Sequence, residues 1–405
     1  MMSSPGITAL SAAGSETYQI CTVTVMDTSD PCITFDADGV SNHAHVAKWR
    51  WSNEVFRGDE AATRLAGWVA RMKRDGRGRE YDCVIGLSGG VDSSYVACKV
   101  VDLGLRPLAI HLDNGWNSEL AVSNIEQIVK RLGIDLFTHV VDWDEIKDLQ
   151  RSYFKASVMD LECVSDHAIN TILLRAANRH GVKYVVQGGN VATESILPTS
   201  WIHDKRDGIN VAAIHKAHGE RNLSTYPLMR PSELAHRLLM RRLKFFPILN
   251  YIDYQKSTAV TELQERIGWR PYGRKHGENR FTRFFQEYYL PRKFGIDKRR
   301  AHLSSMIVSG QITRDEALSE LETPMYRPGE DIEDLAFVAK KLNFSPEELS
   351  VLIEQPGRPH ASYPNASWMF DHRSGLTQVV RYFAKGELSF NTFSKAWRAG
   401  GVPNG

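Results

Sequence analysis

The chain has 405 residues, of which 42% are hydrophobic and 24% charged, and its formal net charge is +2 at pH 7. A chain of this length can form two or three domains with a sizeable core. The near balance of charge does not favour a nucleic-acid or membrane partner, and no stretch is apolar for long enough to cross a bilayer. The cysteines are scattered and odd in number, which indicates free thiols in a cytoplasmic protein. They are Cys21, Cys32, Cys83, Cys98 and Cys163.

The first fifty residues are predicted to be a leader followed by a small β module. Residues 1–14 are small and polar, without the basic start and apolar run of a secretion signal. Residues 17–46 are rich in β-branched residues, Asp, Pro and Gly, which is typical of irregular β structure. Residues 49–73 carry apolar side chains near a 3.6-residue period and predict one helix.

From Tyr81 onward, short apolar runs alternate with amphipathic ones. This alternation predicts an α/β fold, a doubly wound parallel sheet covered by helices on both faces. We expect this domain to span 51–235, and a mainly helical region over 236–405 to bind substrate or form an oligomer contact. Within that region we expect four aromatic residues to form a helix-packing stripe. They are Phe245, Phe246, Tyr251 and Tyr254. The expected strands are 81–87, 107–112, 136–141 and 184–187, and the expected helices are 92–103, 118–132, 143–158 and 165–180.

A Ser/Gly-rich turn lies between the first of these strands and the helix that follows it, over residues 84–94. Such a turn points backbone N–H groups at one spot beside a helix N-terminus, which is suited to phosphate. Gly89 and Gly90 allow close approach, the hydroxyls of Ser88, Ser93 and Ser94 add donors, and Asp92 offers a carboxylate to magnesium. No Gly-Lys-Ser/Thr follows, and the spacing does not match the dinucleotide fingerprint. The alternative is an ordinary turn.

Two further strand ends carry polar residues that should meet the turn, because parallel strands end at one edge of the sheet. Asp113 follows the second strand, and Gly188, Gly189 and Glu194 follow the fourth. The alternatives are a plain turn after Asp113 and a loop glycine pair at 188–189.

The motif from Ser88 to Ser93 resembles the PP-loop of the N-type ATP pyrophosphatases, whose fold is adenine nucleotide alpha hydrolase-like. The resemblance implies that a carbonyl oxygen is adenylated with release of pyrophosphate, and that a nucleophile then displaces AMP. It implies ATP binding by the loop from Leu87 to Ser94, with Ser88 and Asp92 in the reaction, and by the residues at the other two strand ends. It implies Mg²⁺ at Asp92 and Glu194, and it makes Lys205 a candidate to reach the phosphates.

The second half resembles the N-acetyl sugar amidotransferase family of bacterial surface-polysaccharide (LPS O-antigen) biosynthesis. The resemblance lies in the Lys275-His276 pair and in 282–286, 293–295, 297–300 and 309–311. It implies conversion of the acetamido group of an N-acetylated UDP-sugar into an acetamidino group. Basic residues of this region are then candidates to bind pyrophosphate or the sugar diphosphate, although a solvated helix face is the alternative. These candidates are Lys275, His276, Arg283, Lys293, Lys298 and Arg299.

The source of the nitrogen is expected to lie outside this chain, since no glutaminase segment is visible in the sequence. The resemblance implies a separate glutaminase subunit like that of imidazole glycerol phosphate synthase. A cyclase-like partner and a homo-oligomer stay open. Two other functions also stay open: a thiolase-like enzyme that modifies tRNA, and a non-catalytic assembly subunit.

One feature of the sequence departs from the family. Its members usually carry two Cys-x-x-Cys pairs near the N-terminus that resemble a structural zinc site. The corresponding positions are Cys21, Thr24, Ser41 and Ala44, so three of four thiolates are missing. We therefore expect no zinc, and a module held by its own packing. The alternative is a site in which His43, His45 and Cys32 replace the missing thiolates, although their spacing does not resemble a known zinc site.

Overall fold

The computed structural model describes residues 17–239, 243–273 and 277–366. Its centre is one parallel sheet in the order β3-β2-β1-β4-β5. The strands are β1 (Cys83–Gly86), β2 (Pro107–Asp113), β3 (Asp135–Val140), β4 (Tyr184–Gln187) and β5 (Lys244–Pro247). The order reverses between β1 and β4, so the loops after these two strands border the crevice where ligands bind in such sheets. The expected fold class, α/β with a parallel sheet, is confirmed.

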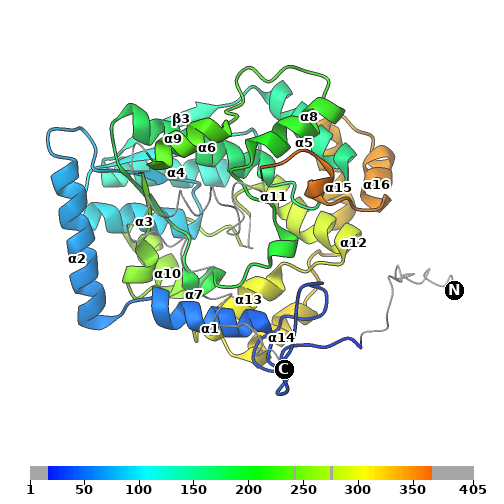
Figure 1. The fold of residues 1–405 in the computed structure, drawn as a ribbon, viewed down its shortest axis with the longest axis horizontal. Coiled ribbons are helices and arrows are strands. Elements are labelled where there is room, and N and C mark those ends of the chain that lie inside the picture. Colours follow the sequence, from blue (N-terminus) through cyan, green and yellow to red (C-terminus); the bar gives the residue numbers. More distant parts are fainter. Residues whose placement is uncertain (1–16, 240–242, 274–276, 367–405) are drawn as a thin grey trace.

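Helices cover both faces of the sheet, and further helices form the rest of the molecule (Figure 1). Those up to β5 and just after it are α1 (Asn42–Glu54), α2 (Gly58–Asp75), α3 (Val91–Asp102), α4 (Glu119–Leu132), α5 (Trp143–Ala156), α6 (Cys163–Arg179), α7 (Val191–Glu194), α8 (Gly208–His218), α9 (Pro231–Leu239) and α10 (Lys256–Ile267). Those that follow are α11 (Arg280–Phe284), α12 (Leu290–Phe294), α13 (Arg299–Val308), α14 (Arg314–Glu322), α15 (Glu330–Leu342) and α16 (Pro346–Glu354). A π-helical turn, Phe285–Tyr289, joins α11 to α12.

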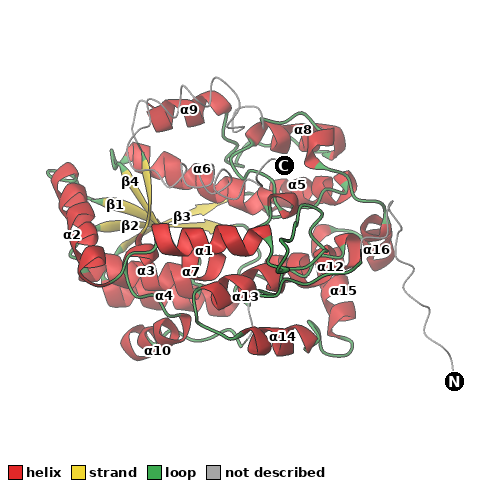
Figure 2. Ribbon diagram, turned by 60° about the horizontal axis from the view of Figure 1, so that its bottom comes forward, coloured by secondary structure: helices red, strands yellow, loops and turns green. Residues whose placement is uncertain are grey.

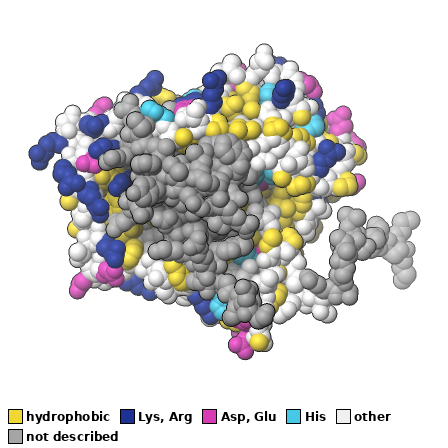
Figure 3. Space-filling view, viewed as in Figure 1, with side chains coloured by type: hydrophobic (Ala, Val, Ile, Leu, Met, Phe, Trp, Pro, Cys, Tyr) yellow, Lys and Arg dark blue, Asp and Glu magenta, His cyan; other side chains and the backbone are white. Residues whose placement is uncertain are grey.

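Helices lie on both sides of the sheet (Figure 2), and a hydrophobic cluster fills the space between each face and its helices. Alternate residues of β2 divide between them, since Ile110 belongs to one cluster and Ala109 to the other. The cluster around α5 and α6 extends from Met26 to Ile353 and so includes residues of all three predicted regions. The other cluster contains α3, α4 and α10. Helix α2 buries Trp68 and Met72 in this second cluster, while Lys and Arg gather on its outer side (Figure 3).

Local signals explain why the elements around the first two strands were predicted nearly to the residue. Ser118 accepts a hydrogen bond from the Ala121 N–H and caps α4, and Gly133 ends this helix with a left-handed φ of 61°. By contrast, Gly90 at the N-cap of α3 supplies no side-chain cap. The first N–H groups of α3 therefore stay available at the Ser/Gly turn.

Three expectations were wrong in detail. The helix expected over 49–73 is two helices, because the chain is extended at Val55 and the Phe56 N–H binds the Asn250 carbonyl. Residues 17–41 form isolated bridges rather than strands, and α1 already begins at Asn42. The aromatic stripe at Phe245 and Phe246 is not helical but forms β5, which pairs with β4.

Among the described residues, no helix combines the length and the apolar composition needed to cross a bilayer.

Candidate functional site

Hydrogen bonds made by its own serines stabilise the Ser/Gly turn. The Ser88 hydroxyl lies 3.0 Å from the Ser93 hydroxyl, and the Gly90 N–H donates to Ser88 Oγ at 3.3 Å. The Ser94 hydroxyl is buried and donates to the Gly90 carbonyl at 2.6 Å. Ser88 is exposed at the mouth of the turn, whereas Ser94 holds the turn in shape. Of the predicted donors, Ser88 and Ser93 therefore lie where a ligand can reach them.

Position 89 requires glycine for two reasons, its backbone conformation and the close packing around it. Its φ is +82°, and a Cβ at this position would lie 2.9 Å from the Ala121 carbonyl oxygen. The Gly89 carbonyl accepts hydrogen bonds from Trp269 Nε1 at 2.9 Å and from the Tyr272 hydroxyl at 2.8 Å. The segment after α10 thus packs directly on the turn and holds its backbone in place.

The turn after β4 meets the start of α3. A Cβ on Gly188 would lie 3.2 Å from the backbone of Asp92, and one on Gly189 would lie 3.5 Å from Glu194 Oε2. These two glycines therefore permit a close approach between the loops after β1 and β4. Asp92 and Glu194, the predicted magnesium ligands, lie on this same side of the site.

Tyr254 is a site residue that the sequence did not reveal. Its hydroxyl donates to the Asp92 carboxylate. Burial, followed by the charges of Asp92 and Glu194, raises the pKa of Tyr254, so the phenol stays protonated and orients Asp92. Tyr254 lies a few residues after β5, at the same edge of the sheet as the other loops. Had residues 244–247 been recognised as a strand, Tyr254 would have been expected at this edge of the sheet.

The arrangement of carboxylates fits Mg²⁺. This ion is usually held by one or two carboxylates, with the remaining positions taken by water and substrate phosphates. Asp92 and Glu194 supply two such groups beside a turn that presents N–H donors. Among the described residues, no group of three or more His, Cys, Asp or Glu side chains is placed to hold a metal. A metal here would depend on the nucleotide for part of its coordination.

A cleft of about 290 Å³ opens beside the turn. One wall contains Ser88 and Ser93, and a second contains His111 and Asn114 at the end of β2. Burial lowers the pKa of His111, whose ring nitrogens contact the Leu87 carbonyl at 2.9 Å and the Asn117 amide at 3.1 Å. His111 is therefore a neutral, oriented polar group. Asp113 is not among the residues that line this cleft, because its carboxylate accepts the Gly115 N–H and closes the turn after β2.

The N-terminal end of α6 forms an acidic wall of the cleft. Glu162 and Asp166 both line it. Lys205 lies behind this wall, with its ammonium 2.6 Å from Asp160 and 3.2 Å from Asp166. Burial opposes the charge of Lys205, but Asp160 and the other acidic neighbours raise its pKa, so it is cationic. Burial raises the pKa of Asp166 to about 6, against the influence of Lys205. Lys298 contacts Glu162 at 3.3 Å in the same region.

The other basic candidates lie elsewhere or outside the described residues. Arg283 pairs with Asp334 and Glu330. Lys293 donates to the Leu352 carbonyl at the end of α16. Arg299 pairs with Asp297 and donates to carbonyls at the end of α14. These contacts hold helices together and give no support to a ligand-binding role. Lys275 and His276 lie outside the described residues, so their roles stay predictions.

The N-terminal positions that match the family's cysteines converge on one buried point. Cys21 Sγ accepts the N–H groups of Thr24 at 3.4 Å and Ser41 at 3.2 Å, and Ser41 Oγ accepts the Ala44 N–H at 3.2 Å. All four residues are fully buried. These hydrogen bonds connect the positions at which the family carries its thiolate ligands. The absence of zinc stays a prediction.

The third wall of the cleft contains Glu278, Asn279 and Thr282. These residues open a segment, 278–374, that matches the family model described as LPS biosynthesis protein WbpG-like, C-terminal domain. This match relates the C-terminal part of the chain to LPS biosynthesis proteins, as the sequence resemblance implied. The domain thus contributes directly to the cleft that faces the Ser/Gly turn.

Other comparisons give shorter or weaker likenesses. A glutamine-dependent NAD(+) synthetase of Aquifex aeolicus (strain VF5) is 37% identical over 73 residues, which are 18% of this chain and only 12% of that protein. The NMN synthetase structure from Francisella tularensis has a TM-score of 0.28 at 18% identity and covers 49% of this chain and 75% of that one. The NH3-dependent NAD synthetase from Campylobacter jejuni subsp. jejuni NCTC 11168, in complex with the nitrate ion, also has a TM-score of 0.28. It is 13% identical and covers 53% of this chain and 94% of that one. TM-scores this low do not establish a common fold, so the α/β assignment depends on the parallel sheet of this chain alone.

Proposed function

We propose that this chain, whose C-terminal part belongs to the WbpG-like domain family, is an ATP-dependent amidotransferase of LPS biosynthesis. It converts the acetamido group of an N-acetylated UDP-sugar into an acetamidino group. One observation carries the proposal: the Ser88–Ser93 turn and residues 278–282 of the WbpG-like domain line the same cleft. This shared lining supports a reaction in which the turn binds the phosphates of ATP and the matched segment helps to bind the substrate.

The reaction balances in two steps. The amide oxygen attacks the α-phosphorus of ATP, which forms an O-adenylated imidate and releases pyrophosphate. Ammonia then adds to the activated carbon, AMP leaves with the former amide oxygen, and the proton lost by the added nitrogen is taken up by the basic amidine. No covalent link to the protein is needed, so catalysis depends on orientation and on stabilised phosphate charge.

The residues of the cleft and of the turns beside it have separable tasks in this scheme. Ser88, Ser93 and the first N–H groups of α3 bind phosphate oxygens. Asp92, oriented by Tyr254, and Glu194 would hold Mg²⁺, which when bound neutralises phosphate charge. His111, Asn114 and Ser165 present neutral hydrogen-bonding groups to the sugar or to the acetamido group, since Asn114 donates to Ser165 at 2.9 Å within the cleft.

The ammonia is proposed to come from a separate glutaminase subunit of the imidazole glycerol phosphate synthase type. Its delivery inside a complex prevents protonation of the nucleophile in bulk solvent. Purified chain supplied with glutamine alone should then be inactive, while ammonium salts support the reaction.

The test is a pyrophosphate-release assay with ATP, Mg²⁺, ammonium and a panel of UDP-N-acetylhexosamines and their uronates. We expect release to depend on one of these sugars, and its product to show the mass change for exchange of O by NH. Asp92→Asn should abolish release, and Asp113→Asn, whose carboxylate accepts the Gly115 N–H and closes the turn after β2, serves as the matched control. Release that instead depends on tRNA would identify a tRNA-modifying enzyme. ATP binding without turnover on any substrate would favour an assembly subunit.

A further inference from the structure

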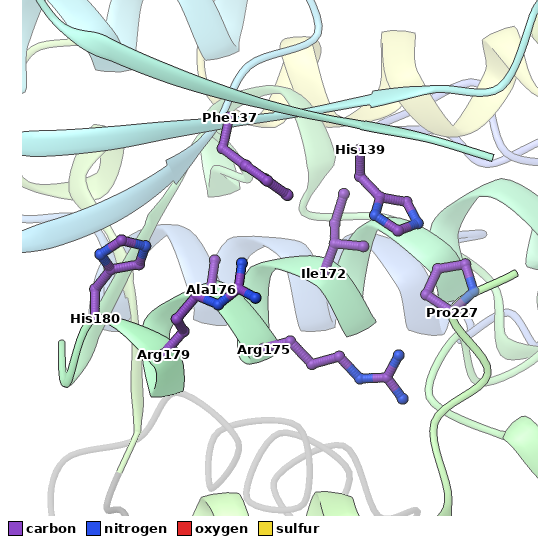
Figure 4. Close-up of a pocket in the computed structure, with 8 residues that line it drawn as sticks. All are labelled: Phe137, His139, Ile172, Arg175, Ala176, Arg179, His180 and Pro227. Carbon is purple, nitrogen blue, oxygen red and sulfur yellow. The ribbon is translucent and has the colours of Figure 1, made fainter. Parts of the chain in front are cut away.

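A second cavity, of about 220 Å³, lies between the edge strand β3 and helix α6 (Figure 4). Phe137 and His139 extend from β3 towards the helix, and Ile172, Ala176 and Arg179 line the helix side. Its walls are largely apolar. The cavity opens at the sheet edge, where Phe137 is 41% exposed. Nothing in the scheme above uses this space.

The second cavity is next to the cleft on the same face of the sheet. In the ladder between β2 and β3, Ile110 pairs with Phe137 and Leu112 pairs with His139. Ile110 and Leu112 line the cleft, while their partners line the second cavity. Paired residues of parallel strands point to the same face, and neighbouring strands lie about 4.8 Å apart. The two spaces are therefore separated by roughly one side chain.

That side chain is Ile172. It is buried and it lines both cavities. The other lining residues belong to one cavity or the other. The Ile172 side chain makes no hydrogen bond, so a movement of the terminal methyl about χ2 breaks none, while the helix restricts χ1 of this β-branched residue.

The second cavity also offers one hydrogen-bond acceptor. His139 Nε2 is buried and has no hydrogen-bond partner among the described residues. Burial lowers the pKa of His139, and a backbone hydrogen bond at Thr225 acts in the opposite direction. A hydrogen bond that stabilises the charged ring is one in which a ring N–H donates. This donor is Nδ1, because Nε2 has no partner among the described residues, so in the neutral ring Nε2 carries the lone pair. It can accept a hydrogen bond from a small N–H donor.

We propose that this second cavity is the route by which ammonia reaches the adenylated acetamido group, and that Ile172 separates the route from the cleft. The inference rests on the proposed function. It meets a need of that function, because ammonia has to reach the acetamido group in a cleft that would already hold ATP and the sugar. The route favours neutral ammonia over ammonium, since apolar walls do not solvate a cation and the guanidinium of Arg179 repels it, whereas Arg175 is paired with Glu233.

The test fills the second cavity without touching the cleft. Ala176 lines the second cavity alone, so Ala176→Phe places a ring in the path, and Ala176→Leu fills it in part. Two reactions are measured with the UDP-N-acetyl sugar that supports pyrophosphate release. One is isotope exchange between pyrophosphate and ATP without ammonium, which reports adenylation. The other is the full reaction with increasing ammonium chloride at constant pH. Val122→Phe, at an exposed position of α4 that lines neither cavity, is the control for a phenylalanine placed elsewhere on the surface.

We expect Ala176→Phe to raise the KM for ammonia about tenfold or more, with exchange within about twofold of the unchanged protein. Ala176→Leu should give a smaller rise, and Val122→Phe none. Unchanged ammonia kinetics in an Ala176→Phe protein that retains exchange would overturn the route. If that variant loses exchange through misfolding, the Leu variant decides by the same comparison. A failure of exchange in the unchanged protein would instead refute adenylation itself, and the route with it.

Discussion

Replacement of Gly89 by alanine tests whether the turn has the backbone shape on which the site depends. A left-handed φ of +82° costs an alanine about 1 kcal/mol, and the forced contact with the Ala121 carbonyl adds about 1–3 kcal/mol. We therefore expect the free energy of unfolding to fall by about 2–4 kcal/mol, because neither a backbone carbonyl nor the turn can move freely. ATP binding should weaken as well, since the N–H groups of the turn lose their common direction.

Gly133 supplies the matched control. It also has a left-handed φ, of +61°, but a Cβ there would have no atom within 4 Å. Gly133→Ala should cost only the conformational part, about 1 kcal/mol, and leave ATP binding unchanged. Urea denaturation of both variants and titration with ATP provide the comparison. Equal stability losses and equal ATP affinity in the two variants would refute the close packing of the turn on α4.

Three further predictions concern single contacts. Tyr254→Phe removes the hydroxyl that donates to Asp92. A lost hydrogen bond to a charged group is worth about 1.5–3 kcal/mol, so the KM for Mg-ATP should rise about tenfold or more while folding is retained. An unchanged KM would contradict the orienting role of Tyr254. Cys21→Ala leaves the N–H groups of Thr24 and Ser41 without their acceptor, so it should lower the free energy of unfolding by about 1–3 kcal/mol, whereas the exposed Cys32→Ala should change nothing; equal denaturation curves would argue against this account. The pKa of Asp166 is raised to about 6, so the folded state holds this proton more tightly than the unfolded chain, and the resulting stability is complete at low pH and is lost as the pH rises to about 6. Asp166→Asn should flatten that part of the curve of unfolding free energy against pH. A slope identical to that of the unchanged protein would show that another group is responsible.

Most of the sheet could be predicted because its signals are local. The strands from Tyr81 to Gln187 are apolar runs bounded by caps and glycines, and β4 was expected with the bounds that it has. The Ser/Gly turn was recognisable from its residues alone, since its backbone geometry, with a left-handed φ at Gly89, is one that few sequences allow. β5 was missed because Phe245 and Phe246 fit a helix stripe as well as a short buried strand, a known ambiguity of apolar runs.

The sequence by itself determined the α/β fold, the Ser/Gly turn between a strand and a helix, and the likeness of the C-terminal segment to LPS biosynthesis proteins, because each depends on neighbouring residues in the chain. Only the tertiary structure decided which distant residues meet that turn. Tyr254 contacts Asp92 across 162 positions, and Trp269 contacts Gly89 across 180. It also decided which charges face the cleft: Arg283 and Arg299 hold helices together, while Glu162 and Asp166 form a wall. Charge can be counted in a sequence, but the direction in which a side chain points is set by the packing of whole elements.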